Sequence, residues 1–458
     1  MVLTKFLDTF KIGDSYYLFN LNNASLIQLD RDIYEKIDAI KQNNNLSILT
    51  NDEKNILISQ GFLVDDNFDK KQISKNKMTY LISKYNNNKD TVKIDFALTN
   101  LCNFNCPYCF EKNNLCHVNQ SENRNYIYET GKDLTDYLKL LISKGIKKIE
   151  IVFYGGEPTI EKDFIIKFLS DLSSVCVDKN VEYEYTFITN GYLFDYNFAS
   201  LLKSENCKFI QITLDGEKIL HNSRRTNLAK INTFDTIIRN INHILSLNFN
   251  VVIRLNIDKT NYESVYNLLN NLENIIDKKY FGKNLGVDIA RVFGSINSYD
   301  LLEYEDYRKK LIDLCIKKHL YTPRVAVPAL TTFCIAESLT NDLVLDYRGN
   351  LYRCWNNVFD EEYKIGNIKT LLARGADPWE DSDITLRFVE ELSLENVNKN
   401  KCFECVYSKY CQGLCPAVRK NIKEGNERNI YLNNECKQII RNRLKQLIYH
   451  ISMETIKW

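Results

Sequence analysis

Between residues 93 and 292 the chain alternates short apolar runs with longer amphipathic stretches. The apolar runs, each of strand length, are 93–98, 148–154, 183–189, 208–214, 250–256 and 286–292. The stretches with helical spacing of apolar residues are 124–144, 161–176, 194–205, 233–247 and 261–278. Continuous apolar strands that alternate with helices predict an α/β fold whose parallel sheet curls into a partial (β/α)6 barrel. In such barrels the loops after the strands carry the chemistry.

The first 70 residues follow a different pattern. Two strand-like runs, 16–20 and 25–29, flank a short polar turn and predict a hairpin. A helical stretch follows, and the segment 50–53 has the form of a capping box that opens a second helix. We interpret residues 1–70 as a small winged-helix-like module and the polar residues 71–92 as a linker that ends in a short helix.

Composition narrows the class of protein. The 458 residues are 44% hydrophobic and carry a formal net charge of +1, so there is no basic surplus to attract nucleic acid or an anionic membrane. No apolar run has membrane-spanning length and the chain does not open with a secretory signal, so we expect a cytoplasmic protein. Fourteen cysteines in such a protein indicate metal ligands more than disulfides.

Three of these cysteines stand together directly after the first predicted strand. Cys102, Cys106 and Cys109 have the spacing C-x3-C-x2-C. Three thiolates can hold three irons of a [4Fe–4S] cube and leave the fourth iron open to bind and reduce a second molecule. The alternative is a structural zinc site, which needs a fourth ligand, and Cys116 and His117 are the nearby candidates.

The loop after the second predicted strand has a sequence suited to a ligand. It reads Gly155-Gly156-Glu157-Pro158. Two glycines allow the backbone to approach a bound molecule closely, and a glutamate can accept hydrogen bonds from an ammonium group. On its own the same sequence would be an ordinary turn.

Polar residues mark the next three strands at or near their carboxyl ends. The third ends with Thr189 and Asn190, the fourth is followed by Asp215, and the fifth contains Arg254 and Asn256. Arg254 suits a bidentate bond to a carboxylate. Its alternative interpretation is a surface arginine, which fits less well within an apolar run.

The C-terminal part contains seven further cysteines in a regular order. They are Cys334, Cys354, Cys402, Cys405, Cys411, Cys415 and Cys436. The central four follow the spacing C-x2-C-x5-C-x3-C. A zinc ribbon would use four of the seven and leave three without a role.

The C-x3-C-x-aromatic-C spacing, in which Tyr108 is the aromatic residue, resembles the signature of the radical S-adenosylmethionine (radical SAM) superfamily. The resemblance implies a TIM-like partial barrel over 93–310 with a catalytic [4Fe–4S] cluster on the three cysteines. It also implies that S-adenosylmethionine binds the open iron and is cleaved to a 5′-deoxyadenosyl radical. The remaining loops and strands named above would contact that cofactor through Tyr108, Gly155, Gly156, Glu157, Pro158, Thr189, Asn190, Asp215, Arg254 and Asn256.

The C-terminal array resembles the SPASM domain, here 334–440, after a bridging region 311–333 and before a C-terminal helix 441–458. The resemblance implies two auxiliary [4Fe–4S] clusters, for three in all. One would use Cys402, Cys405, Cys411 and Cys436. The other would use Cys334, Cys354 and Cys415, which leaves one iron open unless Cys315 completes the set; Cys315 lies on a predicted helix and is expected in the core.

The order of the three parts resembles that of radical peptide maturases of the sactipeptide and ranthipeptide type. The resemblance implies a precursor peptide as partner, with its leader bound by the N-terminal module, and a flavodoxin or ferredoxin as electron donor. The same module could instead be a stabilising cap on the barrel. An open auxiliary iron, which can bind a substrate thiolate, favours a Cys thioether as the product.

Three other functions stay open. Carbon–carbon or carbon–oxygen crosslinking of a peptide is the first. Oxidation of the sulfatase-maturase kind is the second, although Trp355 stands where that branch of the family has an aspartate that acts as a base. An iron–sulfur sensor or electron carrier is the third, and it would have no use for an S-adenosylmethionine pocket.

Overall fold

The computed structural model describes residues 1–86, 90–115, 122–293, 295–320, 342–375, 402–411, 425 and 434–455. These residues belong to two compact units. The terminal unit contains 1–86 together with 402–411, 425 and 434–455. The barrel unit contains 90–115, 122–293, 295–320 and 342–375.

The barrel unit is built on the six predicted strands, and their prediction is confirmed. They are β6 (Thr91–Ala97), β7 (Lys148–Tyr154), β8 (Glu182–Thr189), β9 (Cys207–Leu214), β10 (Val251–Ile257) and β11 (Leu285–Arg291). All neighbours are parallel and follow the chain order, so the carboxyl ends of the strands lie at one edge of the sheet. This is the edge at which the sequence places its candidate residues.

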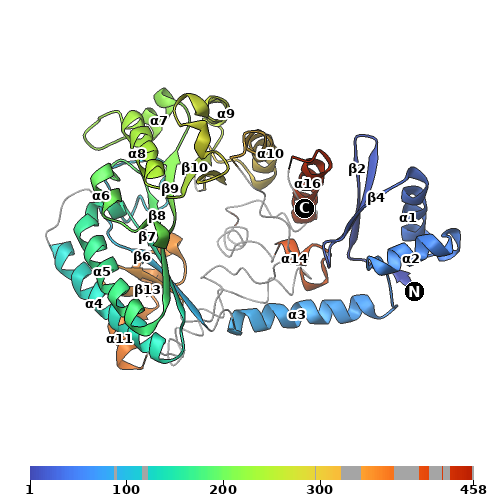
Figure 1. Cartoon of the computed structure of the whole chain (residues 1–458), viewed down its shortest axis with the longest axis horizontal. Coiled ribbons are helices and arrows are strands. Elements are labelled where there is room, and N and C mark those ends of the chain that lie inside the picture. Colours follow the sequence, from blue (N-terminus) through green and yellow to red (C-terminus); the bar gives the residue numbers. More distant parts are fainter. Residues whose placement is uncertain are drawn as a thin grey trace. The chain divides into compact units, whose positions relative to one another are not determined.

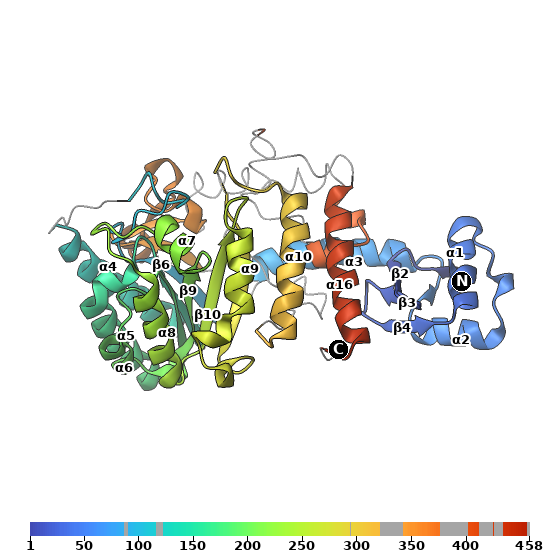
Figure 2. The same ribbon diagram turned by 90° about the horizontal axis from the view of Figure 1, so that it is seen from above.

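Helices follow these strands: α4 (Glu122–Ser143), α5 (Lys162–Lys179), α6 (Tyr196–Ser200), α7 (Lys218–Arg224), α8 (Phe234–Ser246), α9 (Tyr262–Asn270) and α10 (Leu301–Lys317). The sequence predicted α4, α5 and α8 closely and placed longer helices at α6 and α9. It predicted a helix at Cys315, within α10, but not the bounds of that helix, and it did not predict α7. Figures 1 and 2 show α4, α5, α6 and α8 along one side of the strands. Helix α8 illustrates why these helices pack on the sheet, since Ile237, Ile241 and Ile244 repeat at helical spacing and are fully buried.

The sheet continues beyond the six strands. Strand β12 (Leu343–Asp346) pairs parallel with β6, and β13 (Asn350–Tyr352) and β14 (Gly366–Asn367) follow as antiparallel strands before helix α11 (Ile368–Ala373). The sequence interpretation assigned this part to a separate SPASM segment. Residues 343–345 are a short apolar run that is fully buried here, and they cover the otherwise unpaired edge of β6.

The terminal unit contains the predicted hairpin and two helices. Strands β2 (Leu7–Ile12), β3 (Ser15–Asn20) and β4 (Leu26–Leu29) form an antiparallel sheet, β1 (Val2–Leu3) pairs with β5 (Leu63–Val64), and α1 (Arg31–Asn43) and α2 (Asn51–Ser59) follow β4 and precede β5. The predicted capping box is present, since Thr50 Oγ1 accepts from the Glu53 N–H and the Glu53 carboxylate accepts from the Thr50 N–H.

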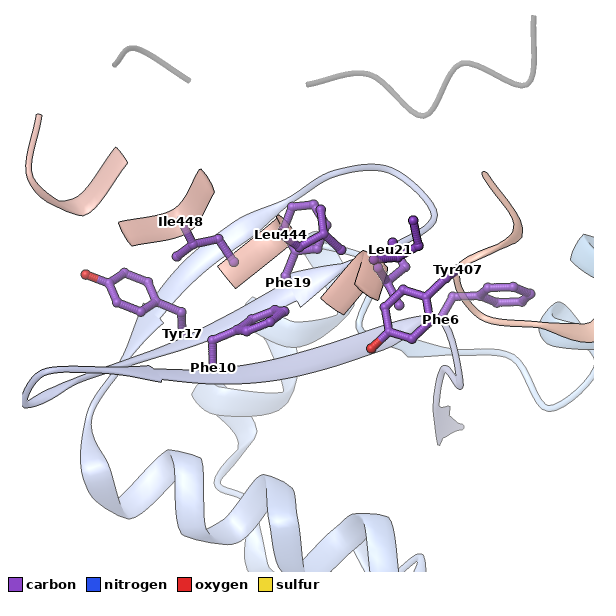
Figure 3. Packing of buried hydrophobic residues seen from close by; sticks show 9 residues of the cluster. Phe6, Phe10, Tyr17, Phe19, Leu21, Tyr407, Leu444 and Ile448 are labelled. Atoms are coloured by element: carbon purple, nitrogen blue, oxygen red, sulfur yellow. The ribbon is translucent and has the colours of Figure 1, made fainter. Parts of the chain in front are cut away.

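Both faces of the three-stranded sheet are covered. Leu18 packs with α1 and α2, whereas its neighbours Tyr17 and Phe19 point to the other face because side chains alternate along a strand. There they meet Leu444 and Ile448 of α16 (Glu435–Ser452), as Figure 3 shows. The second face is therefore covered by the C-terminal part of the chain.

The segment predicted as a linker is different in the structure. Helix α3 runs from Phe68 to Asn86, where the sequence suggested a polar linker with only a short helix at its end. Tertiary contacts hold its first turn, since the Asp69 carboxylate accepts from Thr4 Oγ1 at 2.6 Å and from the Lys5 N–H at 2.8 Å. Such contacts stabilise a polar helix that would be only marginally stable in isolation.

Over the described residues, the helices are all too short or too polar to span a membrane.

Candidate functional site

The loop that carries Cys102, Cys106 and Cys109 follows strand β6, and all three side chains are half-buried. A second segment pairs with its backbone. The Asn105 N–H donates to the Thr226 carbonyl at 2.8 Å, and the Leu228 N–H donates to the Asn103 carbonyl at 3.0 Å. Phe104 and Asn227 form an antiparallel bridge between the two. The cysteine loop is therefore fixed by main-chain bonds.

The two glycines after β7 touch this same loop. A Cβ on Gly156 would lie 2.1 Å from the Leu101 carbonyl oxygen, and one on Gly155 would lie 2.9 Å from the Cβ of Ala97. The Glu157 N–H donates to the Leu101 carbonyl at 2.8 Å. Both glycines also have positive φ angles, +85° and +26°. The glycines are required because the two loops pack backbone against backbone.

Glu157 is fully buried and binds protein donors with both carboxylate oxygens. Its Oε1 accepts from Thr159 Oγ1 at 2.5 Å and from Thr189 Oγ1 at 2.6 Å, and its Oε2 accepts from the Asn190 N–H at 2.7 Å. Burial raises the pKa of this carboxyl, and the hydrogen bonds counteract the rise. Asn190 Nδ2 in turn donates to Asn103 Oδ1 at 2.7 Å. Glu157 thus joins the ends of β7 and β8 to the cysteine loop, a role beyond the predicted ammonium acceptor.

Glu111 is a buried carboxyl of the cysteine loop that the sequence did not single out. It is 6% exposed and accepts a hydrogen bond from the Gly156 N–H. Burial raises its pKa to about 7. A lone glutamate two residues beyond a cysteine motif gives no recognisable signal in a single sequence.

Asp215 lies directly after β9 and is fully buried. Its Oδ2 is 3.3 Å from Arg224 Nε, while both terminal nitrogens of Arg224 pair with Asp258 at 3.2 and 3.0 Å. Arg225 Nη1 donates to Tyr108 Oη at 2.9 Å. The two arginines link the fourth strand to the aromatic residue of the motif, and the sequence analysis did not identify either.

Arg254 and Asn256 lie on β10, where buried and half-buried residues alternate and these two belong to the half-buried set. Arg254 Nη1 pairs with Asp288 of the neighbouring strand, and Arg254 Nε donates to Asn256 Oδ1 at 3.1 Å. The surface interpretation of Arg254 is therefore incomplete, because an inter-strand ion pair orients it on the sheet.

The thiols of the cysteine loop fit an iron–sulfur cluster. Burial raises the pKa of Cys102 and Cys106, and it raises the pKa of Cys109 to about 11. A coordinating cation overcomes this cost, since a thiol bound to a metal is deprotonated. No three His, Cys, Asp or Glu side chains in the described ranges converge as the ligands of one ion do. The ligands of a [4Fe–4S] cube can lie farther apart than those of a single ion, because each cysteine binds a different iron.

Several buried polar atoms near this loop have no partner among the described protein atoms. They are Asn103 Nδ2, Glu111 Oε1, Asp215 Oδ1 and Arg225 Nε. Buried polar groups in proteins are nearly always hydrogen-bonded, so unpartnered ones indicate a ligand. These unpartnered donors and acceptors suit a small zwitterion with a ribose, and S-adenosylmethionine is such a molecule.

The C-terminal cysteines are divided between the units. Cys402, Cys405, Cys411 and Cys436 lie in the terminal unit, and burial followed by the charges of Cys411 and Cys405 raises the pKa of Cys436. Cys354 follows β13 in the barrel unit. Cys334 and Cys415 lie outside the described residues, as do Cys116 and His117 of the zinc alternative. Cys315 is fully buried in α10, as expected for a core residue.

Trp355 directly follows Cys354 and is 40% exposed. Its ring meets the ring of Tyr154, the last residue of β7, with the centroids 5.9 Å apart and the planes at 61°. An aromatic surface therefore stands beside Gly155, at the carboxyl end of the sheet.

Comparison with known proteins agrees with this geometry. Residues 96–272 match the family model described as the Radical SAM superfamily. The chain is 25% identical over 382 residues to a cysteine-type anaerobic sulfatase-maturating enzyme of Clostridium novyi, and the match covers 76% of this chain and 94% of the relative. It is 24% identical to the radical SAM cyclopropyl synthase TigE of Paramaledivibacter caminithermalis, with 46% of this chain and 48% of TigE covered.

Among solved structures, the fold is similar to that of Streptococcus suis SuiB bound to its precursor peptide SuiA. The TM-score is 0.51 at 16% identity, and the match covers 92% of this chain and 96% of SuiB.

Proposed function

The chain carries a radical SAM domain over residues 96–272, and from that premise we propose that it is a maturase of a ribosomally made precursor peptide. In this proposal it cleaves S-adenosylmethionine reductively and installs a crosslink, a Cys thioether. One observation carries the proposal: the cysteine loop is bonded to the loops after β7 and β8 and to the segment that follows β9, so these four loops are connected at one edge of the sheet.

The residues of the barrel unit have separate tasks. Cys102, Cys106 and Cys109 would hold the cluster, and a bound cluster with S-adenosylmethionine supplies the one-electron cleavage that makes a carbon-centred radical. Gly155 and Gly156 keep the loop after β7 against the residues that precede the cysteines. This close packing would position the cofactor.

The cofactor contacts are proposed by position. Asp215 and Asn256 would accept hydrogen bonds from the ribose and amino groups, Arg254 would bind the carboxylate, and Thr189 and Asn190 would line the pocket. Arg254 would then exchange its bond to Asp288, or share it, when the ligand carboxylate arrives. Glu157 would act through its hydrogen bonds to Thr189 and Asn190.

A peptide partner is supported by relatives that act on peptides or proteins. One is named a sulfatase-maturating enzyme, and SuiB is described with a precursor peptide bound. In the terminal unit both faces of the three-stranded sheet are covered, while β2 and β4 are its edge strands among the described residues. A leader would therefore bind by strand addition at an edge.

The thioether rests on the C-terminal cysteines. A second auxiliary cluster with three protein ligands would offer its open iron to a substrate thiolate. Trp355 has no carboxylate with which to act as the base of a sulfatase-maturase-type oxidation. Flavodoxin or ferredoxin would supply the electron.

A carbon–carbon crosslink is the second candidate. The observation that favours it is the sequence similarity to TigE, which is named a cyclopropyl synthase. The two products differ at the substrate cysteine, because only the thioether consumes a thiol.

The experiment follows from this difference. The full chain, loaded with iron and sulfide without oxygen, is incubated with S-adenosylmethionine, a reductant and the short peptide encoded beside its gene. The thioether predicts a product lighter by two hydrogens whose cysteine no longer reacts with iodoacetamide. The same mass loss with an alkylatable cysteine would support the carbon crosslink instead.

A further inference from the structure

The segment 402–411 lies against the N-terminal sheet of β2, β3 and β4. Cys405 and Cys411 both pack on the apolar cluster that this sheet forms with α16. The ring of Tyr410, next to Cys411, has its centroid 6.2 Å from that of Phe19 in β3. The surroundings of these cysteines are therefore supplied in part by residues from the other end of the chain.

Hydrogen bonds tie the same segment to the N-terminal residues. Lys5 Nζ donates to the carbonyl of Glu404, which lies between two of the cysteines, at 3.3 Å. Lys409 Nζ donates to the Asn22 carbonyl at 2.8 Å from a position close to the third cysteine. The segment is thus held near each of its cysteines by polar bonds as well as by apolar contact.

Asp8 joins the sheet to both C-terminal elements. Its carboxylate accepts from Tyr407 Oη of the segment and from Arg441 Nε of α16, the latter at 2.9 Å. Arg441 also donates to the Thr9 carbonyl at 2.8 Å. Cys436 is the second residue of α16, so the fourth cysteine lies on a helix that the same carboxylate holds.

The four cysteines lie on short elements that contact one another. Cys402 and Cys405 belong to one turn, since the Cys405 N–H donates to the Cys402 carbonyl at 3.1 Å. Cys411 ends α14 (Ser408–Cys411), which contacts both that turn and α16 with Cys436. Since each ligand of a [4Fe–4S] cube binds a different iron, this arrangement suits a cube.

We propose that this N-terminal sheet positions the four cysteines for their cluster, in addition to any role in binding a leader. Segments of a single helical turn are not stable on their own, so their order before a metal binds must come from what they pack against. A cluster that binds only the ordered segment stabilises the sheet in return. The cysteines of the loop 102–109 belong to the barrel unit and should load independently.

The inference deepens the proposed function, on which it rests for the presence of a cluster at these cysteines. Strand β3 contains a matched pair of residues with which to test it. Phe19 is 1% exposed and faces the cysteine segment, whereas Leu18 is fully buried against α1 and α2 on the opposite face. Replacing either by alanine removes a large buried side chain, but of the two it is Phe19 that packs with the segment.

The experiment compares Phe19→Ala with Leu18→Ala in the full chain, reconstituted with iron and sulfide without oxygen. Iron analysis and the electron paramagnetic resonance of the reduced protein measure the clusters. Phe19→Ala should lose at least half as much iron as Cys405→Ala loses, whereas Leu18→Ala should retain the iron of the unaltered chain. Similar iron contents in the Phe19 and Leu18 variants would overturn the proposal.

A second measurement leaves the sheet unchanged, and it decides the question if Phe19→Ala unfolds the terminal unit. Loading the unaltered chain with iron and sulfide should slow hydrogen exchange of the β2 and β3 amides at least tenfold. The same loading of Cys405→Ala should leave their exchange unchanged. No slowing in the unaltered chain, or equal slowing in both proteins, would refute the role of the sheet.

The proposed function can fail separately from this inference. A chain that shows the expected iron contents and the expected slowing of exchange, yet forms no 5′-deoxyadenosine when reduced with S-adenosylmethionine, would contradict the proposed function and leave the role of the sheet intact.

Discussion

Two of the cysteine-bearing segments, 102–109 and 402–411, are held in contrasting ways. The loop 102–109 of the barrel unit is bonded through its backbone to 226–228, and the residues just before it, 97–101, pack against Gly155 and Gly156. The segment 402–411 of the terminal unit is held mainly by side chains: Tyr407 Oη donates to the Asp8 carboxylate, and Lys409 Nζ donates to the Asn22 carbonyl at 2.8 Å.

The two kinds of attachment place different demands on the sequence. Main-chain bonding demands residues that permit a particular backbone path, and it fixes the sulfur positions narrowly. Side-chain docking demands a complementary apolar surface, here Phe6, Phe10 and Phe19, and tolerates more variation in path. The first arrangement suits chemistry at a cluster. The second suits a segment whose attachment can be weakened without unfolding the barrel.

Replacing one cysteine in each segment should separate the two most strongly. Cys106→Ala should abolish formation of 5′-deoxyadenosine, because two thiolates do not hold the cluster in a reactive state. Cys405→Ala should retain cleavage of S-adenosylmethionine but make no crosslinked peptide. Chromatography of both products from reduced, iron-loaded protein measures this. Equal losses of 5′-deoxyadenosine in the two variants would remove the functional distinction.

Gly156→Ala should be the most disruptive substitution that leaves every cysteine in place. Its Cβ cannot fit 2.1 Å from the Leu101 oxygen unless a backbone moves, and we expect a loss of about 4 kcal/mol. Gly375→Ala is the matched control, since Gly375 has φ +72° with nothing within 4 Å and should lose only about 1 kcal/mol. Unfolding in urea, monitored by hydrogen exchange of the barrel strands, measures the loss of stability in each variant. Similar losses in the two variants would contradict close packing at Gly156.

Leu444→Ala tests the side-chain docking in the terminal unit. Leu444 is 1% exposed against the sheet, so its truncation should cost about 3 kcal/mol. The cost should appear as faster hydrogen exchange of the β2 and β3 amides, with exchange in β6–β9 unchanged. Lys445→Ala, one position along the same helix, is the control for helix propensity. Faster exchange in both sets of strands would show that the two units do not unfold independently.

His221 should make the barrel unit sensitive to acid. Burial, followed by the charge of Arg225, lowers its pKa from 6.5 to about 3. Below pH 6.5 the unfolded chain therefore binds a proton at His221 that the folded chain does not bind. Stability is fully present above pH 6.5 and falls by about 1.4 kcal/mol per pH unit as the pH drops from 6.5 toward 3.

The measurement is the urea midpoint of the barrel unit at pH 7.5 and 5.5. The unaltered chain should lose stability between these values, and the loss in His221→Gln should be smaller by about 1.4 kcal/mol. An identical pH dependence in both proteins would mean that His221 is protonated in the folded state.

Tyr407→Phe should give the smallest effect. It removes one hydroxyl that donates to Asp8, while Arg441 Nε still donates to the same carboxylate at 2.9 Å. We expect the free energy of opening of the terminal-unit amides, measured by hydrogen exchange, to fall by about 1 kcal/mol. A loss as large as that of Leu444→Ala would show that the polar contact, and not the apolar core, carries the docking.

The sequence predicted the barrel well because its signals are local and repeated. Six apolar runs are confirmed as β6 to β11, and the five helical stretches between them contain α4, α5, α6, α8 and α9. The capping box at Thr50 is confirmed for the same reason, since both partners lie within one turn. The candidate loops stand at one edge because parallel strands place their ends together.

The misses concern contacts between distant parts of the chain. Strand β12 was assigned to another domain, although it completes the sheet beside β6. Arg224 and Arg225 belong to no pattern that singles them out in the sequence, and only the fold brings them to Tyr108 and Asp215. The cover that α16 gives to the N-terminal sheet pairs residues more than 400 positions apart in sequence, which no local pattern encodes.

The most direct test of the account is whether the reduced, iron-loaded chain cleaves S-adenosylmethionine when no peptide is present. We predict that the unaltered chain and Cys405→Ala each release 5′-deoxyadenosine and methionine in equal amounts, and that Cys106→Ala releases neither. An unaltered chain that carries its iron–sulfur signal, accepts the electron and yet releases no 5′-deoxyadenosine would contradict it.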